Sequence, residues 1–228
     1  MEKSIKSNVD SVKARIEAAA LKTGRVPGEV KLLAATKNRS TGLVLEAFDA
    51  GVKVFGENRV QELVDKVGEV GEEADWHFIG HLQRNKVKAV TAIVSLIHSV
   101  DSLKLAREID KRAWEAGKNQ AILLQVNVAG EESKFGIAPE DVGELLDELY
   151  DLNNIDIKGL STIAPLVDEH EDVRWVFREL KRLGQDLGVS KGNFNCAELS
   201  MGMTGDFEVA VEEGSTIVRV GTAIFDID

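Results

Sequence analysis

The hydrophobic pattern of the chain begins with a single helical stripe. Apolar residues recur every three or four positions from Ile5 to Ala19, which is the spacing of one face of an amphipathic helix. Gly24 and Pro27 follow, and both residues disfavour a continued helix. We therefore expect an N-terminal helix that packs across the fold formed by the rest of the chain.

Short apolar runs alternate with helical stripes in the rest of the chain. Eight runs are typical of buried strands, and they cover residues 30–37, 52–56, 76–80, 95–100, 121–128, 155–160, 196–201 and 216–221. A helix is expected in each gap, with apolar stripes over residues 60–67, 87–93, 103–113, 142–149 and 173–187 and a short helix over 205–213.

This alternation indicates the class of fold. Continuous apolar strands separated by helices are typical of a parallel sheet that is covered on both faces. Eight such units in 228 residues predict an α/β fold, a single (β/α)8 barrel of the TIM type with an extra N-terminal helix. A doubly wound open sheet is the alternative. Because no linker or break in composition divides the chain, we expect one domain over residues 1–228.

Composition and charge exclude several classes of partner. The net charge of −11 and the pI near 5.0 oppose a general attraction to nucleic acid or anionic lipid. Cys196 is the only cysteine, so we expect a small core residue, no disulfide and no cysteine set for zinc. No apolar run approaches the roughly 20 residues that span a bilayer, and the N-terminus lacks the apolar core of a signal peptide. We expect a soluble, cytoplasmic monomer.

The candidate chemistry lies where the strands end, because a barrel places its site at their carboxyl ends. Lys37 closes the first predicted strand. It is either an ordinary charge that reaches for water or a nucleophilic amine made reactive by desolvation. Other polar residues that follow strands are Asn58, Arg59, His81, His98, Asp101 and Asn127.

The loops after the last two strands carry the pattern of an anion site. Barrels often bind phosphate there. Ser200, Thr204 and Thr222 supply hydroxyl groups, while Gly202 and Gly221 let backbone N–H groups approach an anion closely. The alternative is that these are ordinary turn glycines with Thr204 as a helix cap.

Two further features concern charged or ligating side chains inside strands. Arg219 lies within an apolar strand, so it either faces a carboxylate as a structural ion pair or donates to a bound ligand. His77 and His81 are four residues apart, but on a strand that spacing does not bring them together. We therefore expect no metal site.

Seven collinear segments resemble one protein family. They are "LLAATKNRS", "FGENRVQEL", "WHFIGHLQRNK", "HSVDS", "VNVAGEESKFGI", "GLSTIAP" and "LSMGMTGDFEVAVEEGSTIVRVGTAIF". Together they cover residues 30–225 and resemble the pyridoxal phosphate homeostasis protein family, which is itself similar to the N-terminal barrel of alanine racemase.

The resemblance implies a cofactor and a set of residues that bind it. Lys37 would form a Schiff base with pyridoxal phosphate, and Arg219 would face the pyridine nitrogen. Asn58 and His81 would line the ring, and the phosphate would be held by Ser200, Gly202, Gly221 and Thr222. Two residues depart from the family pattern: Ser161 stands where methionine is usual, and Asp226 stands where glycine is expected.

The function implied by the resemblance is to buffer the cofactor or to deliver it to recipient apoenzymes, without catalysis. One alternative is a racemase or decarboxylase that uses the same cofactor, and another is a cofactor-free isomerase of a sugar phosphate with Lys37 as its Schiff-base lysine. Racemisation needs a second base, which in the racemases is a tyrosine of a C-terminal β domain. The sequence ends at Asp228, directly after the eighth strand, and Tyr150 is its only tyrosine, so we expect neither that domain nor that base.

Overall fold

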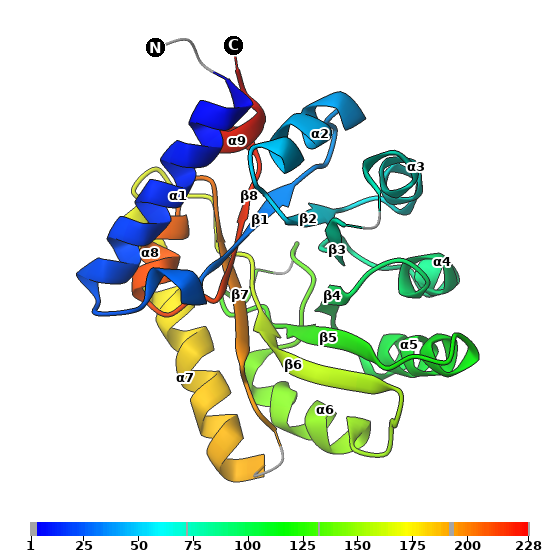
Figure 1. Ribbon diagram of the computed structural model, residues 1–228. Helices are drawn as coiled ribbons and strands as arrows, with labels where there is room; N and C mark the ends of the chain where they lie inside the picture. Colours follow the sequence, from blue (N-terminus) through cyan, green and yellow to red (C-terminus); the bar gives the residue numbers. More distant parts are fainter. Residues whose placement is uncertain (1–3, 72, 132, 192–193, 228) are drawn as a thin grey trace.

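The structure, a computed structural model, describes residues 4–71, 73–131, 133–191 and 194–227. Eight parallel strands close into a barrel in chain order, with helices on the outside (Figure 1). The strands are β1 (Lys31–Ala35), β2 (Val54–Glu57), β3 (Asp75–Phe78), β4 (Leu96–Val100), β5 (Gln120–Gln125), β6 (Ile155–Ser161), β7 (Glu198–Met203) and β8 (Ile217–Val220). The predicted barrel is therefore confirmed, and the open sheet is excluded because β1 pairs with β8.

A helix follows every strand, as predicted. The helices are α2 (Thr41–Asp49), α3 (Val60–Val70), α4 (Val87–Thr91), α5 (Leu103–Glu115), α6 (Val142–Leu149), α7 (Arg174–Lys191), α8 (Phe207–Glu212) and α9 (Thr222–Phe225). Short 3-10 turns cover Pro27–Glu29, Arg84–Lys86, Pro139–Asp141 and His170–Val173. Each helix returns the chain to the amino end of the barrel, so the polar residues after the strands gather at the opposite rim.

The N-terminal helix α1 (Ile5–Lys22) begins at Ser4, whose side chain forms a capping box with Ser7. Its predicted apolar stripe is buried. The helix packs on the outer wall against α8, α9 and α2 rather than across an end of the barrel (Figure 1). The side chain of Asn8 donates a hydrogen bond of 3.0 Å to the carbonyl oxygen of Ile224, which ties α1 to the last helix.

The interior of the barrel is only partly apolar. Along β8, Ile217 and Arg219 point inward while Val218 and Val220 pack against the outer helices, as the alternation of a strand requires. The apolar interior cluster consists of Leu33, Ala35, Leu96, Leu123 and Ile217. Buried polar side chains also lie in the interior, among them His77, His98, Ser161, Ser200 and Arg219.

The seventh strand begins two residues later than predicted. Its pairing with β6 starts where Glu198 lies opposite Gly159, so Cys196 precedes the strand and is half-buried. An added Cβ at Gly159 would lie 1.9 Å from the carbonyl oxygen of Glu198, so only glycine permits this pairing. Burial raises the pKa of the Cys196 thiol to about 11. The thiol is thus protonated at neutral pH, which opposes a role as a nucleophile.

Candidate functional site

Lys37 lies in the turn that follows β1, at the rim of the barrel. Its side chain is exposed, and no hydrogen bond or ion pair within the described ranges involves it. The structure therefore presents an accessible amine rather than a desolvated one. The next residue, Asn38, has a φ of 57°, a left-handed conformation that asparagine tolerates better than most residues.

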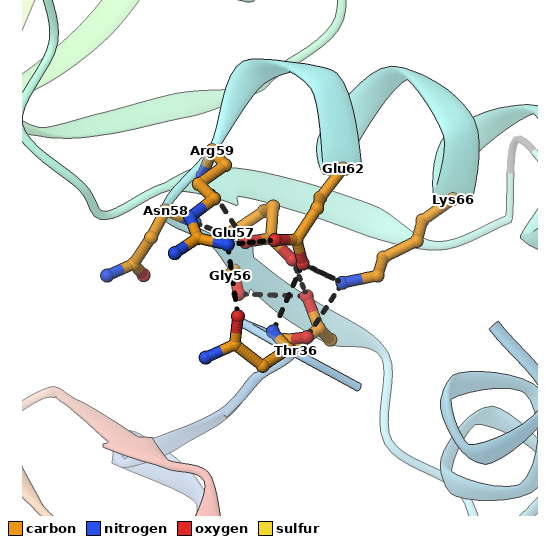
Figure 2. A network of polar contacts seen from close by, with 8 residues as sticks. Thr36, Gly56, Glu57, Asn58, Arg59, Glu62 and Lys66 are labelled. Atoms are coloured by element: carbon orange, nitrogen blue, oxygen red, sulfur yellow. Dashed lines mark hydrogen bonds and ion pairs between the residues drawn. The ribbon is translucent and has the colours of Figure 1, made fainter. Parts of the chain in front are cut away.

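A buried ionic network fixes the backbone directly before Lys37 (Figure 2). The amine of Lys66, on α3, donates to the carbonyl oxygen of Thr36 at 2.7 Å and to the Glu57 carboxylate at 2.6 Å. Glu57 is fully buried and also accepts a hydrogen bond of 2.7 Å from the Thr36 hydroxyl. Glu62 completes the network with an oxygen 3.0 Å from the Lys66 amine.

The same network holds the residue after Lys37. The backbone N–H of Asn38 donates to Glu62 at 3.1 Å. The Arg59 guanidinium donates to the side chain of Asn38 and to Glu62, both at 3.1 Å. Both neighbours of Lys37 are therefore anchored, while its own amine is exposed and has no hydrogen bond or ion pair among the described residues. No pattern in the sequence indicated this network, because its members come from three separate elements.

Asn58 follows β2 and presents an unpaired acceptor. Its backbone N–H donates to the Glu57 carboxylate at 2.6 Å. Its side-chain oxygen is buried and has no hydrogen-bond partner among the described residues. A Cβ at Gly80 would lie 2.3 Å from the carbonyl oxygen of Asn58, so the exits of β2 and β3 touch. A buried acceptor without a donor is costly, and such an atom at a barrel rim points to a bound group.

His81 lies in the loop after β3 and stacks on an aromatic side chain that was not predicted to be part of the site. The rings of His81 and Phe135 are 3.8 Å apart at their centres and nearly parallel, at 12°. Asp101 lies 3.9 Å from the His81 imidazole. Phe135 comes from the loop after β5, where Asn127 donates to the carbonyl oxygen of Glu131 at 2.9 Å. The pair forms a flat apolar surface at the rim, with Phe135 56 % exposed.

The loops after β7 and β8 join each other next to the end of β1. The Thr204 hydroxyl lies 3.3 Å from the backbone nitrogen of Gly221 and accepts its hydrogen bond. A Cβ at Gly221 would lie 3.2 Å from the carbonyl oxygen of Ala35. The predicted anion loops therefore lie beside the strand that leads to Lys37.

Close packing in the β7 loop requires glycine. Gly202 has a φ of 93°, and an added Cβ would lie 2.6 Å from the Cβ of Ala210. At the start of α9, Thr222 is exposed, and no hydrogen bond in the described part of the chain uses its hydroxyl. The Thr222 hydroxyl is thus open to a ligand.

Ser200 lies deeper than expected. It is fully buried in the barrel interior, and its hydroxyl accepts a hydrogen bond of 2.6 Å from the Arg219 guanidinium. The structure therefore separates Ser200 from the other predicted phosphate ligands, and Thr204 takes the place between the two loops. The reason is the register of β7, which turns Ser200 inward.

Arg219 is buried without a carboxylate partner. Its guanidinium donates to the carbonyl oxygens of Ser200 and Thr162, each at 2.7 Å. No ion pair to it occurs among the described residues, so the structure does not show the ion pair that was one of the two alternatives, although the charge of Asp206 raises the pKa of Arg219. Burial lowers the pKa of Arg219 to about 10, so the guanidinium keeps its charge at neutral pH.

The two departures from the family pattern have clear contacts. The Ser161 hydroxyl donates to the carbonyl oxygen of His98 at 2.5 Å inside the barrel. Asp226 forms an ion pair of 2.7 Å with Arg39, which balances its negative charge beside the anion loops. Neither residue disrupts the rim.

Metal-binding clusters and membrane-spanning helices are both absent from the described ranges. No group of three His, Cys, Asp or Glu side chains in those ranges converges so as to hold a metal ion. None of the helices there has the length and apolar character needed to cross a membrane.

The fold and the rim define the class of protein. A barrel with an accessible lysine after β1 and glycine loops after β7 and β8 corresponds to the model of the family "Alanine racemase, N-terminal domain", which matches residues 4–228. The alanine racemase of Clostridium difficile 630 superposes with a TM-score of 0.75 at 14 % identity, over 96 % of this chain and 56 % of that one. At that identity the likeness shows the fold alone.

The chain belongs to the pyridoxal phosphate homeostasis protein family. The family member of Aquifex aeolicus is 46 % identical over 212 residues, covering 92 % of each chain, and that of Escherichia coli K12 is 37 % identical, covering 97 % of this chain and 95 % of its own. PipY of Synechococcus elongatus PCC7942, solved with PLP bound, has a TM-score of 0.86 at 33 % identity and covers 97 % of this chain and 100 % of its own. The relatives are named for homeostasis and not for a reaction, in agreement with the expected absence of enzyme activity.

Proposed function

We propose that this protein binds pyridoxal phosphate through a Schiff base on Lys37 and buffers the cofactor or delivers it to recipient apoenzymes in the cytoplasm. The observation that carries the proposal is the position of the exposed Lys37 amine. It follows β1, whose neighbour β8 leads into one anion loop, and the other anion loop, after β7, contacts the first. The relatives' names and the PLP-bound PipY structure support it.

The residues present fit the cofactor. Pyridoxal phosphate supplies an aldehyde that condenses with a primary amine, a ring nitrogen and a phosphate dianion. Lys37 offers the amine, and the unpaired buried oxygen of Asn58 offers an acceptor. Of the five guanidinium N–H groups of Arg219, three are used by Ser200 and Thr162. The remaining two are available to a ligand within the described part of the barrel.

Each part of the rim takes a distinct task in this proposal. The backbone N–H groups near Gly202 and Gly221, with the Thr222 hydroxyl, hold the phosphate. Arg219 donates toward the ring nitrogen, and His81 with Phe135 provides the flat surface beside the ring. Because a guanidinium only donates hydrogen bonds, Arg219 keeps that nitrogen unprotonated, which weakens the electron sink that amino-acid chemistry needs.

A transfer assay tests the proposal directly. The purified protein is loaded with pyridoxal phosphate, passed through a desalting column and mixed with an apoenzyme that depends on the cofactor. We expect visible absorbance after desalting and a gain of apoenzyme activity that follows the amount of loaded protein. A protein that stays colourless and transfers no cofactor would contradict the proposal.

Thr222→Val should weaken retention of the cofactor about 10- to 100-fold, because a hydrogen bond to a charged group contributes about 1.5–3 kcal/mol. Thr222→Ser keeps the hydroxyl and should behave like the parent. Equilibrium dialysis with pyridoxal phosphate measures both. Equal retention by Thr222→Val and Thr222→Ser would remove this hydroxyl from the phosphate site.

We also predict negligible turnover of free amino acids. Tyr150, the tyrosine that the sequence offers as a second base, directly follows α6 at the amino end of the barrel and is 72 % exposed. It therefore lies at the opposite end from Lys37. Deuterium exchange at Cα of alanine and serine in heavy water is the measurement. Exchange at about 1 s⁻¹ or faster, as in enzymes, would favour the racemase instead.

A further inference from the structure

Five polar side chains form a continuous hydrogen-bonded row through the barrel. From one end to the other they are Asp75, His77, His98, Ser200 and Arg219, and we call them the interior chain. The carboxylate of Asp75 lies 3.3 Å from Nε2 of His77, and Nδ1 of His77 lies 2.9 Å from Nε2 of His98. Nδ1 of His98 lies 2.8 Å from the Ser200 hydroxyl, which accepts from Arg219 at 2.6 Å.

The interior chain joins the two ends of the barrel. Asp75 opens β3 at the amino end, where its side chain is 48 % exposed. Arg219 lies near the carboxyl end, because its guanidinium donates to Thr162, the residue after β6. The members between them are at most 4 % exposed. A group open to water at one end is thus connected, without a gap, to the floor of the proposed cofactor site.

The direction of every hydrogen bond in the interior chain follows from its acidic end. An ionised carboxylate only accepts, so Nε2 of His77 donates to Asp75. In the arrangement that continues this direction, Nδ1 of His77 accepts from Nε2 of His98. Nδ1 of His98 then accepts from the Ser200 hydroxyl. The Ser200 oxygen is left to accept from Arg219, which agrees with a guanidinium that can only donate.

The surroundings keep His98 neutral and Asp75 charged. Burial lowers the pKa of His98 well below its usual value. The hydrogen bond from His77 lowers the pKa of Asp75, so this carboxylate is charged at neutral pH. Other charged groups nearby are Lys31 on β1 and Glu198 on β7, which pair with each other, and Asp206, whose carboxylate acts on Arg219 and raises its pKa. Every donor N–H or O–H then points from the Arg219 guanidinium toward the Asp75 carboxylate. This alignment stabilises both charges in a medium of low dielectric constant.

We propose that Asp75, His77, His98 and Ser200 are positioning residues that hold the Arg219 guanidinium for the ring of the bound cofactor through this polarised interior chain. The inference rests on the proposed function, in which Arg219 faces the ring nitrogen. It gives the buried guanidinium a second and more distant counter-charge, Asp75, in addition to Asp206, whose carboxylate raises the pKa of Arg219. It also gives Ser200 a task other than binding phosphate.

Nuclear magnetic resonance of the cofactor-free protein tests the direction of the interior chain. The whole protein has four histidines, so long-range ¹H–¹⁵N spectra report each ring. The variants His77→Gln and His98→Gln assign the signals of the two interior rings. We expect both interior rings to carry a proton on Nε2 at pH 7, and His98, whose pKa is lowered by burial, to remain neutral at pH 5.5. His81 and His170 are exposed and serve as references outside the interior chain. A proton on Nδ1 of either interior ring at pH 7 would overturn the proposal.

Binding measurements test the positioning role. Asp75→Ala should weaken retention of pyridoxal phosphate about fivefold, because it removes one charged end of a cooperative network. Asp75→Asn keeps an acceptor oxygen and should lose less. Asp156→Ala is the matched control, since Asp156 also lies on the amino side, at the second position of β6, and pairs with Lys158. Affinity for inorganic phosphate should be the same in all these proteins, because the interior chain does not reach the anion loops.

The possible outcomes separate this inference from the proposed function. A parent protein that binds no pyridoxal phosphate would contradict the proposed function, while the histidine spectra would still report on the interior chain. Equal loss of pyridoxal phosphate in Asp75→Ala and Asp156→Ala would overturn the positioning role. If Asp75→Ala does not fold, Asp75→Asn decides: a shift of the His77 Nε2–H resonance without any change in cofactor retention would also overturn it.

Discussion

Replacing Lys37 with alanine should abolish the covalent attachment of pyridoxal phosphate while leaving the barrel folded. The side chain of Lys37 is exposed and makes no contact that supports the fold among the described residues. Its loss therefore removes the amine and little else. We expect the visible absorbance of the loaded protein to disappear. Treatment with borohydride, which makes the linkage permanent, should leave no cofactor mass on the variant.

Lys37→Arg is the control for the charge of this side chain, because a guanidinium keeps the positive charge but does not form the linkage. Both variants should still retain some cofactor reversibly through the loops after β7 and β8. A cofactor mass that persists on Lys37→Ala after reduction, on any other lysine, would contradict the assignment of Lys37.

Replacing Lys66 with methionine should destabilise the protein by about 3–5 kcal/mol, because it leaves Glu57 as an unpaired buried charge. Glu57 is fully buried, and the Lys66 amine is 2.6 Å from its carboxylate. The same amine holds the carbonyl oxygen of Thr36, so we also expect a less ordered turn around Lys37. Urea denaturation followed by circular dichroism measures the free energy of unfolding.

Lys118→Met is the matched control for this prediction. Lys118 is a partly buried lysine that donates to the carbonyl oxygens of Thr91 and Val94, each at 3.0 Å, and burial lowers its pKa. Its loss leaves no buried carboxylate behind, so it should cost less than Lys66→Met. The double variant Glu57→Gln Lys66→Met should recover part of the lost stability. Equal stabilities of Lys66→Met and Lys118→Met would show that the buried pair does not support the rim.

Much of the fold was predictable because periodicity is a local signal. Each buried strand shows a short apolar run and each helix a stripe, so the number and order of the elements follow from single segments. The predicted start of β7 was wrong by two residues, because the strand begins where Glu198 pairs with Gly159 on β6. That contact joins distant parts of the chain, and no local pattern records it.

The candidate site was only partly predictable, because topology locates strand ends but not the direction of each side chain. Lys37, Asn58 and Thr222 lie at the rim as expected, whereas Ser200 points into the interior. The alternation of inward-facing and outward-facing side chains along β7 would have placed Ser200 in the barrel interior. The Lys66 network and the interior chain had no such signal, because a single charged or ring residue on an element does not reveal its partner.

The contact between the two ends of the chain has a consequence for the newly made protein. Asn8 on α1 holds the carbonyl oxygen of Ile224, 216 residues further along, and β1 finds its neighbour β8 only when that strand exists. The ribosome makes Lys37 early and the anion loops last, with roughly 10 to 40 s between them at ordinary rates of synthesis. On the proposed function, the amine is present during that interval without the groups that would select a phosphorylated aldehyde, so other aldehyde metabolites would compete for it on equal terms. Chemical selectivity would then begin when the barrel closes.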